Sequence, residues 1–207
     1  MTDTNTDIDV ILFDLGGVLV ELAGVEKMLE WSKDLGSTDE LWRRWLSSEA
    51  VRAFETGRIG TEEFSQRLVG EFGLPVPPAE FLQAFDGWPR ALFPGAKDLL
   101  AELSPHYRLA SVSNTNELHW ARFTNVWTLD QSFHHNFPSH HVGRLKPDAD
   151  YFEHVLEAMG TPASRVLFVD DNAINVAAAA QLGMVTRRVI GVKGAREAMS
   201  ALGLLSA

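Results

Sequence analysis

The stretch VILFDLGGVLVEL, residues 10–22, decides the fold class of this chain. It begins with a run of apolar residues rich in β-branched types and without polar alternation, which is typical of a parallel strand covered on both faces. The run ends on an acid, Asp14, and a glycine turn follows at Gly16 and Gly17. We therefore expect a buried strand over residues 10–13 that delivers one carboxylate to its carboxyl end.

Three later apolar runs have the same character, at residues 109–112, 166–169 and 185–190. Helical patterns separate them, including a short helix expected over residues 172–182 with Asn172 as its N-cap. Strands that alternate with helices predict a parallel sheet with right-handed crossovers. The fold class is therefore α/β, with a doubly wound, Rossmann-like sheet.

The segment between the first strand and the second differs from the rest of the chain, because it contains no convincing strand. Its apolar residues, among them Trp42 and Trp45, fall at helical spacing and are expected in a local core. We predict that residues 21–91 form a helical insert. The α/β core would then consist of residues 1–20 and 92–207.

The composition bounds the class of partner. The chain has 207 residues, of which 45% are hydrophobic and 22% charged, so it can bury a substantial core. Its formal net charge of −10 provides no basic excess to neutralise phosphates, and we expect no nucleic acid partner. A small phosphorylated substrate remains compatible with this charge, since one local cation can outweigh the global field.

The sequence also bears on disulfide bonds, signal peptides and membrane spans. The chain has no cysteine, which excludes disulfides and thiol chemistry. The N-terminal MTDTNTDID lacks the basic and apolar regions of a signal peptide, and no apolar run reaches the length of a membrane span. We expect a cytoplasmic protein without membrane contact, and a monomer by default.

Polar residues that could carry chemistry follow the predicted strands. In an open parallel sheet, ligands bind at the carboxyl ends of the strands, so side chains there are expected to converge. The sequence offers acids, a hydroxyl and an amide at such positions, and a cation just before a predicted helix. The candidates are Asp14, Ser113, Asn114, Lys146, Asp170 and Asp171.

These groups form a chemically coherent set. Three crowded carboxylates raise one another's pKa unless a cation lies among them, and Mg²⁺ suits two carboxylates, waters and a phosphate. Ser113 and the amides that open the following helix could hold phosphate oxygens, and Lys146 would add a second positive charge. Asp14 could then attack phosphorus and form an aspartyl-phosphate.

Four segments in this order, FDLGGVL, SVSNTN, GRLKPDADYF and FVDDNAINVAAAAQLG, resemble the motifs of the haloacid dehalogenase-like (HAD) hydrolase superfamily. The sequence is most similar to its phosphatases with a helical cap inserted after the first motif, and FETGRIGTEEF in the insert also resembles that branch. The resemblance implies a doubly wound core and a four-helix cap that closes over the site.

The resemblance also implies roles for single residues. Asp14 would be the nucleophile and a Mg²⁺ ligand, together with the carbonyl of Gly16 and the carboxylate of Asp171. Asp170 would either bind the metal or support its ligands.

The remaining motif residues would contact the phosphate. Ser113 would bind it beside the backbone of Asn114, and Lys146 would stabilise the charge that develops on it. The leading function is a Mg²⁺-dependent phosphomonoester hydrolase acting on a small phosphorylated metabolite such as a sugar phosphate.

Gly16 departs from the superfamily pattern. Most of its phosphatases carry there a second aspartate, which protonates the leaving group and later activates water. A subgroup similar to sugar-1-phosphate phosphatases shares the D-L-G pattern, so the glycine does not imply a dead enzyme. The proton would come from an ordered water or from Glu21, or the leaving group would be acidic enough to need little help.

Two other functions stay open at the sequence level. A cofactor-free haloacid dehalogenase would share the fold, but it does not need the adjacent acids Asp170 and Asp171. A non-catalytic relative that binds a phosphorylated ligand or a partner protein would explain Gly16. The histidines of FHHNFPSHH lack the spacing of a zinc site, and we expect no structural metal there.

Overall fold

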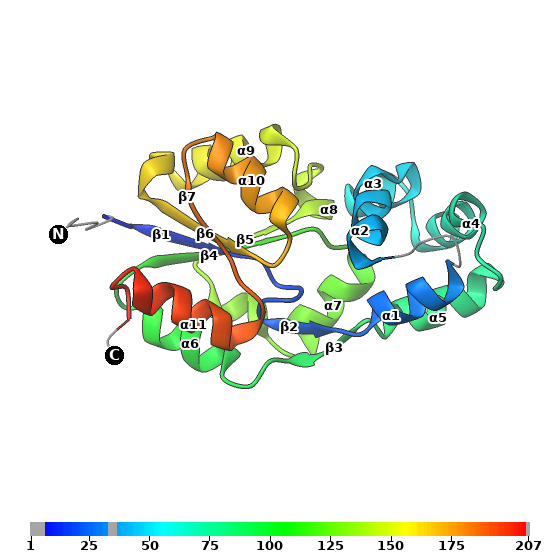
Figure 1. Cartoon of the computed structure of the whole chain (residues 1–207), viewed down its shortest axis with the longest axis horizontal. Coiled ribbons are helices and arrows are strands. Elements are labelled where there is room, and N and C mark those ends of the chain that lie inside the picture. The colour runs from blue at the N-terminus through cyan, green and yellow to red at the C-terminus, as the bar shows by residue number, and fades with distance from the viewer. Residues whose placement is uncertain (1–6, 33–36, 206–207) are drawn as a thin grey trace.

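The computed structural model describes residues 7–32 and 37–205. Figure 1 shows the helices and strands of the chain; among the described residues, five helices follow one another after β2, and helices are interspersed with strands in the remainder. The strands are β1 Val10–Phe13, β2 Val20–Leu22, β3 Pro89–Leu92, β4 Arg108–Ser113, β5 His135–Pro138, β6 Val166–Asp170 and β7 Val185–Arg188. The α-helices are α1 Gly24–Trp31, α2 Thr38–Ser47, α3 Glu49–Glu55, α4 Thr61–Phe72, α5 Pro78–Asp86, α6 Ala96–Leu103, α7 Glu117–Asn125, α8 Ser139–Val142, α9 Ala149–Met159, α10 Ala173–Gln181 and α11 Gly191–Ala201. Two short 3₁₀ helices are η1 Leu129–Ser132 and η2 Ala163–Arg165.

Five strands form one parallel sheet in the order β5-β4-β1-β6-β7. The central strand β1 lies between β4 and β6, where Phe13 pairs with Ser111 on one side and Val169 on the other. This register brings the carboxyl ends of three strands to the same edge of the sheet. The predicted doubly wound α/β fold is confirmed.

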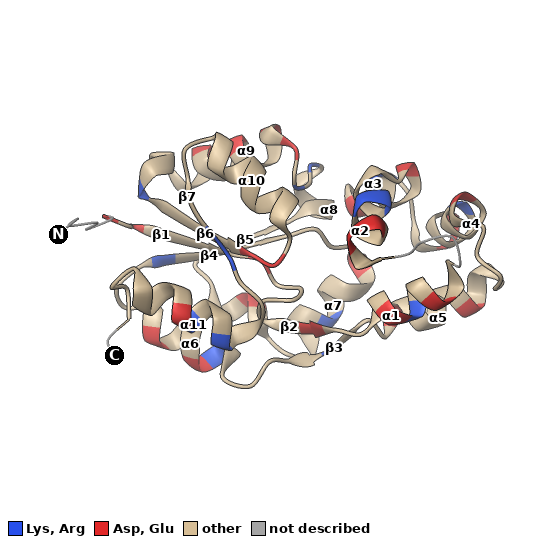
Figure 2. Cartoon of the chain, in the orientation of Figure 1, with Lys and Arg blue, Asp and Glu red and all other residues tan. Residues whose placement is uncertain are grey.

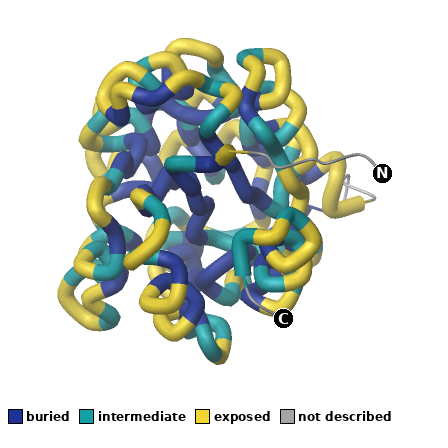
Figure 3. The backbone as a smooth tube through the Cα atoms, turned by 90° about the vertical axis from the view of Figure 1, so that its left-hand side faces the viewer, coloured by how far each residue is buried: buried dark blue, intermediate teal, exposed yellow. Residues whose placement is uncertain are grey.

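Successive residues of β1 enter two different hydrophobic cores, because side chains alternate between the faces of a strand. Ile11 and Phe13 pack in the core that includes residues of α6 and α11, whereas Val10 and Leu12 pack in the core formed with α9 and α10. Figure 1 shows these helix pairs on opposite sides of the sheet, and Figure 3 shows the buried strands enclosed by more exposed helices. Two covered faces explain why the sequence of this strand is apolar throughout.

Helices α1 to α5 form a third core beyond the carboxyl ends of the strands (Figure 1). Aromatic rings dominate it: Phe54 stacks on Phe64 with centroids 4.2 Å apart, and Trp45 lies 5.2 Å from Trp88. The described part of this segment has five helices, one more than the four expected. The extra helix arises at Ser48, which ends α2 and whose side chain accepts the Val51 N–H at the start of α3.

A short antiparallel hairpin joins this helical segment to the sheet. Strand β2 pairs with β3, with Val20 opposite Leu92, where the chain enters and leaves the helices. We predicted no strand between residues 22 and 90, and β3 shows that this was wrong. The pairing partner lies far away in the sequence, so no local pattern indicates it.

Of the smaller structural predictions, some are confirmed and some are wrong. Asn172 is confirmed as an N-cap, since its Oδ1 accepts the Ile174 N–H at 2.9 Å. The last strand ends at Arg188, earlier than predicted. The histidine-rich segment is regular: it forms edge strand β5 and helix α8. The polar residues His135 and Asn136 give this strand no hydrophobic pattern, and its backbone pairing with β4 defines it instead.

The outer helices carry acidic and basic residues together, as Figure 2 shows. No described helix is both long enough and apolar enough to cross a bilayer.

Candidate active site

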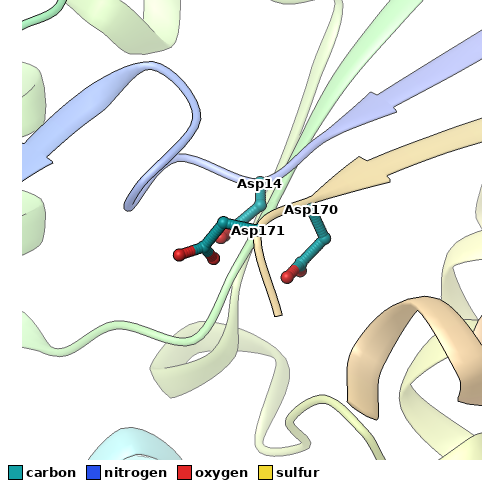
Figure 4. Close-up of side chains that lie close together, drawn as sticks. All are labelled: Asp14, Asp170 and Asp171. Atoms are coloured by element: carbon teal, nitrogen blue, oxygen red, sulfur yellow. The ribbon is translucent and has the colours of Figure 1, made fainter. Parts of the chain in front are cut away.

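Three strand ends bring the predicted residues to one place. Asp14 follows β1, Ser113 ends β4, and Asp170 ends β6 with Asp171 next to it, while Lys146 comes from the loop before α9. Figure 4 shows the three carboxylates beside one another at the ends of β1 and β6. All but Asp171 are less than 10% exposed.

A cavity of about 110 Å³ opens at this point. Six of the seven predicted site residues line it, and the exception is Asp170, which is fully buried. The six are Asp14, Gly16, Ser113, Asn114, Lys146 and Asp171.

Lys146 is the cation of the site. Its Nζ donates to Asp14 Oδ1 at 2.8 Å and to Asp170 Oδ2 at 2.7 Å, and the side chain is 1% exposed. Burial alone would lower the pKa of this ammonium, but the Asp14 and Asp170 carboxylates raise it above its usual value. Lys146 is therefore protonated and fixes the direction of the Asp14 side chain.

Asp170 is held by protein donors on both oxygens. Besides Lys146, the backbone N–H of Asn172 donates to Oδ1 at 2.7 Å, and Asn175 Nδ2 lies 3.2 Å from Oδ1 and 3.1 Å from Oδ2. A carboxylate occupied in this way orients its neighbours. This geometry favours a supporting role for Asp170 over metal ligation. Asn175 was not recognised in the sequence, where it is one polar residue in a helix of alanines.

The carboxylate cluster fits a divalent cation. One ligand oxygen from each of Asp14, Asp170 and Asp171 lies within 4.8 Å of the others. The ammonium of Lys146 pairs with Asp14 and Asp170, and the neighbouring Asp171 adds a third carboxylate, so ionisation of all three exceeds the charge of this ammonium. Burial and the neighbouring Asp170 raise the pKa of Asp171 to about 7, and burial raises that of Asp14 well above its usual value. Mg²⁺ would remove this repulsion and finds oxygen ligands here.

Gly17 allows the cluster to form. Its φ of +72° lies in the left-handed region, and a Cβ at this position would overlap the Asp171 carboxylate. Gly16 adopts ordinary backbone angles, and a Cβ there would lie 2.8 Å from Leu22 Cδ1, the end of a flexible side chain. The chain therefore needs glycine at position 17 more strictly than at position 16.

The side chain of Asn114 has a role that the sequence did not suggest. Its Nδ2 donates to the Lys146 carbonyl at 2.8 Å, and its Oδ1 accepts the Lys146 N–H at 2.8 Å. This reciprocal pair ties the end of β4 to the loop that carries Lys146. Asn114 thus positions the ammonium.

The other wall of the cavity comes mainly from the helical segment and is largely apolar. Trp45, expected in the local core of this segment, is confirmed there and also lines the cavity. Glu55 is the charged residue of this wall: it is 6% exposed, and its Oε1 accepts the Trp45 Nε1–H at 3.3 Å. Burial raises the pKa of Glu55 to about 7, although the Trp45 bond and the charges of Lys146 and Arg52 oppose this shift. Glu21, the acid considered from the sequence, does not line the cavity.

Several residues that line the cavity have buried polar atoms that are not hydrogen-bonded to any described residue. In the described chain, four of them each have a buried oxygen or nitrogen without a hydrogen bond. Such atoms are costly to bury and are usually satisfied by a ligand or water. The atoms are Glu55 Oε2, Trp88 Nε1, Thr115 Oγ1 and Asn175 Oδ1.

Comparison with known proteins gives the same assignment. The model of the haloacid dehalogenase-like hydrolases matches residues 8–183. A sesquiterpene phosphatase from Aspergillus oryzae is 31% identical over 186 residues, which are 87% of this chain and 89% of that protein. A D-ribitol-5-phosphate phosphatase from Bacteroides thetaiotaomicron is 24% identical over 188 residues, 85% of this chain and 89% of that protein.

The chain also resembles a solved structure that contains magnesium and phosphate. A HAD family enzyme from Bacteroides thetaiotaomicron, in complex with magnesium and inorganic phosphate, is 27% identical. It superposes with a TM-score of 0.69, covering 88% of this chain and 94% of that one. Fold, motif order and family match coincide, and the chain belongs to the haloacid dehalogenase-like hydrolases.

Proposed function

We propose that this protein is a Mg²⁺-dependent phosphatase that hydrolyses a small phosphate monoester through an aspartyl-phosphate on Asp14. The observation that carries the proposal is the pairing of Asp14 with Lys146 inside a cavity that also holds Asp171. This class agrees with two relatives that match the chain over most of its length and are both phosphatases by name.

The residues divide the work as follows. Lys146 holds Asp14 Oδ1, which directs the other oxygen of that carboxylate toward the phosphorus atom. Ser113 and the backbone of Asn114 receive phosphate oxygens, and Lys146 stabilises the negative charge that grows on them. Asp14, Asp171 and the Gly16 carbonyl would hold Mg²⁺, which supplies charge neutralisation for the dianionic phosphate. Asp170 keeps Lys146 and the neighbouring backbone in position.

The helical segment acts as a cap over the core. We assign residues 21–91 to the cap and residues 1–20 and 92–207 to the core. Two polar contacts support this closure: Arg52 pairs with Asp148, and Thr61 donates to Glu117.

The substrate class follows from the wall opposite the carboxylates. The sequence suggested a sugar phosphate, and one relative does act on a ribitol phosphate by name, whereas the other acts on a sesquiterpene. We propose that the organic group of the substrate is largely apolar, because apolar side chains dominate this wall and would pair poorly with sugar hydroxyls. They include Leu22, Trp42, Leu46, Trp88 and Phe123.

The alternatives have less support. A dehalogenase without a metal has no use for the buried excess of negative charge at Asp14 and Asp171. A purely binding role leaves the pairing of Asp14 with Lys146 unexplained.

The test is phosphate release from sugar phosphates, prenyl phosphates and p-nitrophenyl phosphate, with Mg²⁺ or with EDTA. We expect turnover to need both Mg²⁺ and Asp14, so that Asp14→Asn and EDTA each abolish it, and prenyl phosphates to be the better natural esters. Release of halide without metal would support the dehalogenase, and absence of release from every ester would refute the phosphatase.

A further inference from the structure

Residue 16, where the superfamily resemblance implies an aspartate that donates a proton, is glycine in this chain. An alcohol leaving from phosphorus needs a proton, and the water that later attacks the aspartyl-phosphate must lose one. If the proposed function holds, another lining group should perform these transfers. The titratable lining residues are Asp14, Glu55, His119, Lys146 and Asp171.

Four of these five residues are engaged in other interactions or roles and are poor candidates for the proton transfer. Asp14 is the nucleophile, Asp171 a metal ligand, and Lys146 is held protonated between two carboxylates. His119 has both ring nitrogens engaged: Nε2 donates to the Phe85 carbonyl at 2.8 Å. Its Nδ1 therefore accepts from Asn116 Nδ2 at 3.3 Å, and burial lowers the His119 pKa to about 4. An imidazole fixed in this way stays neutral and has no nitrogen free for the substrate.

Glu55 has the properties that the missing group requires. It ends helix α3 and is 6% exposed, and its Oε2 has no hydrogen-bond partner among the described residues. The Trp45 Nε1–H bonds only to Oε1, so Oε2 has no partner among the described residues, and Glu55 is one of the residues that line the cavity. Lys146 is close enough for its charge to act on the carboxyl, so Glu55 and the nucleophile share one electrostatic environment.

We propose that Glu55, supplied by the inserted helices, is the general acid and base that replaces a side chain at position 16. As Asp14 Oδ attacks phosphorus and the ester P–O bond breaks, the protonated Glu55 gives its proton to the departing alkoxide oxygen. Water then attacks phosphorus, its proton passes to the Glu55 carboxylate, and the P–O bond to Asp14 breaks with the electron pair returning to Asp14. Inorganic phosphate and protonated Glu55 result, ready for another turnover.

The surroundings of Glu55 favour this cycle. Burial raises its pKa to about 7, while the Trp45 bond and the charges of Lys146 and Arg52 act in the opposite direction. Both protonation states are therefore accessible near neutral pH, which is the condition for efficient proton transfer in either direction.

Glu55→Gln tests the proposal, because glutamine keeps the shape and the bond from Trp45 but cannot transfer a proton. The full chain with Mg²⁺ is given p-nitrophenyl phosphate, whose leaving group needs no proton, and a primary alkyl phosphate, whose leaving group does. For the alkyl ester we expect kcat/KM to fall by about 10²–10⁴-fold. For the aryl ester we expect a normal burst of p-nitrophenol followed by slow turnover, with labelled phosphate accumulating on Asp14.

The control is Glu49→Gln on the same helix, where the side chain is exposed and no rate should change. A double variant, Glu55→Gln with Gly16→Asp, should recover alkyl phosphate turnover, and adding Leu22→Ala makes room for the new side chain.

The outcomes separate the two levels of inference. Equal losses of kcat/KM for both esters, a change in KM alone, or no change would overturn the role of Glu55 while leaving the phosphatase intact. If wild type itself releases no phosphate from any ester, the proposed function fails, and the role of Glu55 fails with it.

Discussion

Replacing Glu55 by glutamine should stabilise the folded chain at neutral and alkaline pH. The carboxyl is 6% exposed and has a pKa of about 7 in the folded chain, against 4.5 for the free side chain. Below pH 4.5 it is protonated in both states and costs nothing. Between pH 4.5 and 7 the unfolded chain releases the proton and the folded chain keeps it, so the free energy of unfolding falls as the pH rises.

The size of the effect follows from the same values. Each pH unit over which Glu55 is ionised only in the unfolded chain lowers the free energy of unfolding by about 1.4 kcal/mol. Between the two pKa values the total loss caused by Glu55 is therefore about 3 kcal/mol. Glutamine has no such cost and keeps an oxygen for the Trp45 Nε1–H. The difference in unfolding free energy between Glu55→Gln and wild type should therefore grow by about 2–3 kcal/mol from pH 5 to pH 8.

Urea unfolding in EDTA at several pH values measures this difference. Other titrating groups, including Asp14 and Asp171, cancel because both proteins contain them. Glu49→Gln, at an exposed position on the same helix, is the matched control variant. A difference that stays constant from pH 5 to pH 8 would refute the reasoning, since it would mean that Glu55 ionises in the folded chain as easily as in water.

Three further perturbations test the site. Mg²⁺ at a hundred times its dissociation constant should raise the unfolding free energy by about 2.7 kcal/mol, and Asp171→Asn should remove most of this gain; an equal gain in the variant would contradict the assigned ligand. Gly17→Ala should lower the free energy of unfolding in urea by at least about 1–2 kcal/mol. It should also weaken Mg²⁺ binding, because the added Cβ overlaps the Asp171 carboxylate. Gly160→Ala, with a similar φ and open space around it, should show only the backbone cost. Lys146→Met should destabilise the metal-free chain by about 3–5 kcal/mol, since Asp14 and the fully buried Asp170 lose their shared ammonium; a loss below 1 kcal/mol would mean that the pair is hydrated.

The sheet was predictable because its strands are buried on both faces. The bounds of β1, Val10–Phe13, agree with the prediction, since every residue of that strand belongs to a core. Edge strand β5 was missed because backbone bonds to β4 define it, while His135 and Asn136 give no hydrophobic signal. Local patterns report burial, and they report strand pairing only where pairing and burial coincide.

The part of the site that lies at the ends of the strands could be predicted from the sequence. Asp14, Ser113 and the acids after β6 converge because parallel strands share one carboxyl edge. The different surroundings of Asp170 and Asp171 were not readable, because they depend on Lys146 and on the donor Asn175, which lies five residues beyond Asp170. Adjacent acids look alike in a sequence and are distinguished only by the donors that fold against them.

Glu55 lay outside the prediction for a deeper physical reason. In the sequence it is one acid of many in an acidic chain, and a charge on a short helix normally faces water. Its burial is a property of the packing between the inserted helices and the core. The Arg52–Asp148 pair joins α3, three residues before Glu55, to the loop that carries Lys146. If Glu55 is the proton donor and Asp14 the nucleophile, as proposed, the catalytic arrangement depends on that packing. A donor at position 16 would be present however the inserted helices lie, whereas the proposed donor Glu55 would reach the leaving group only with these helices packed against the core, where they would also exclude bulk water from the proposed aspartyl-phosphate.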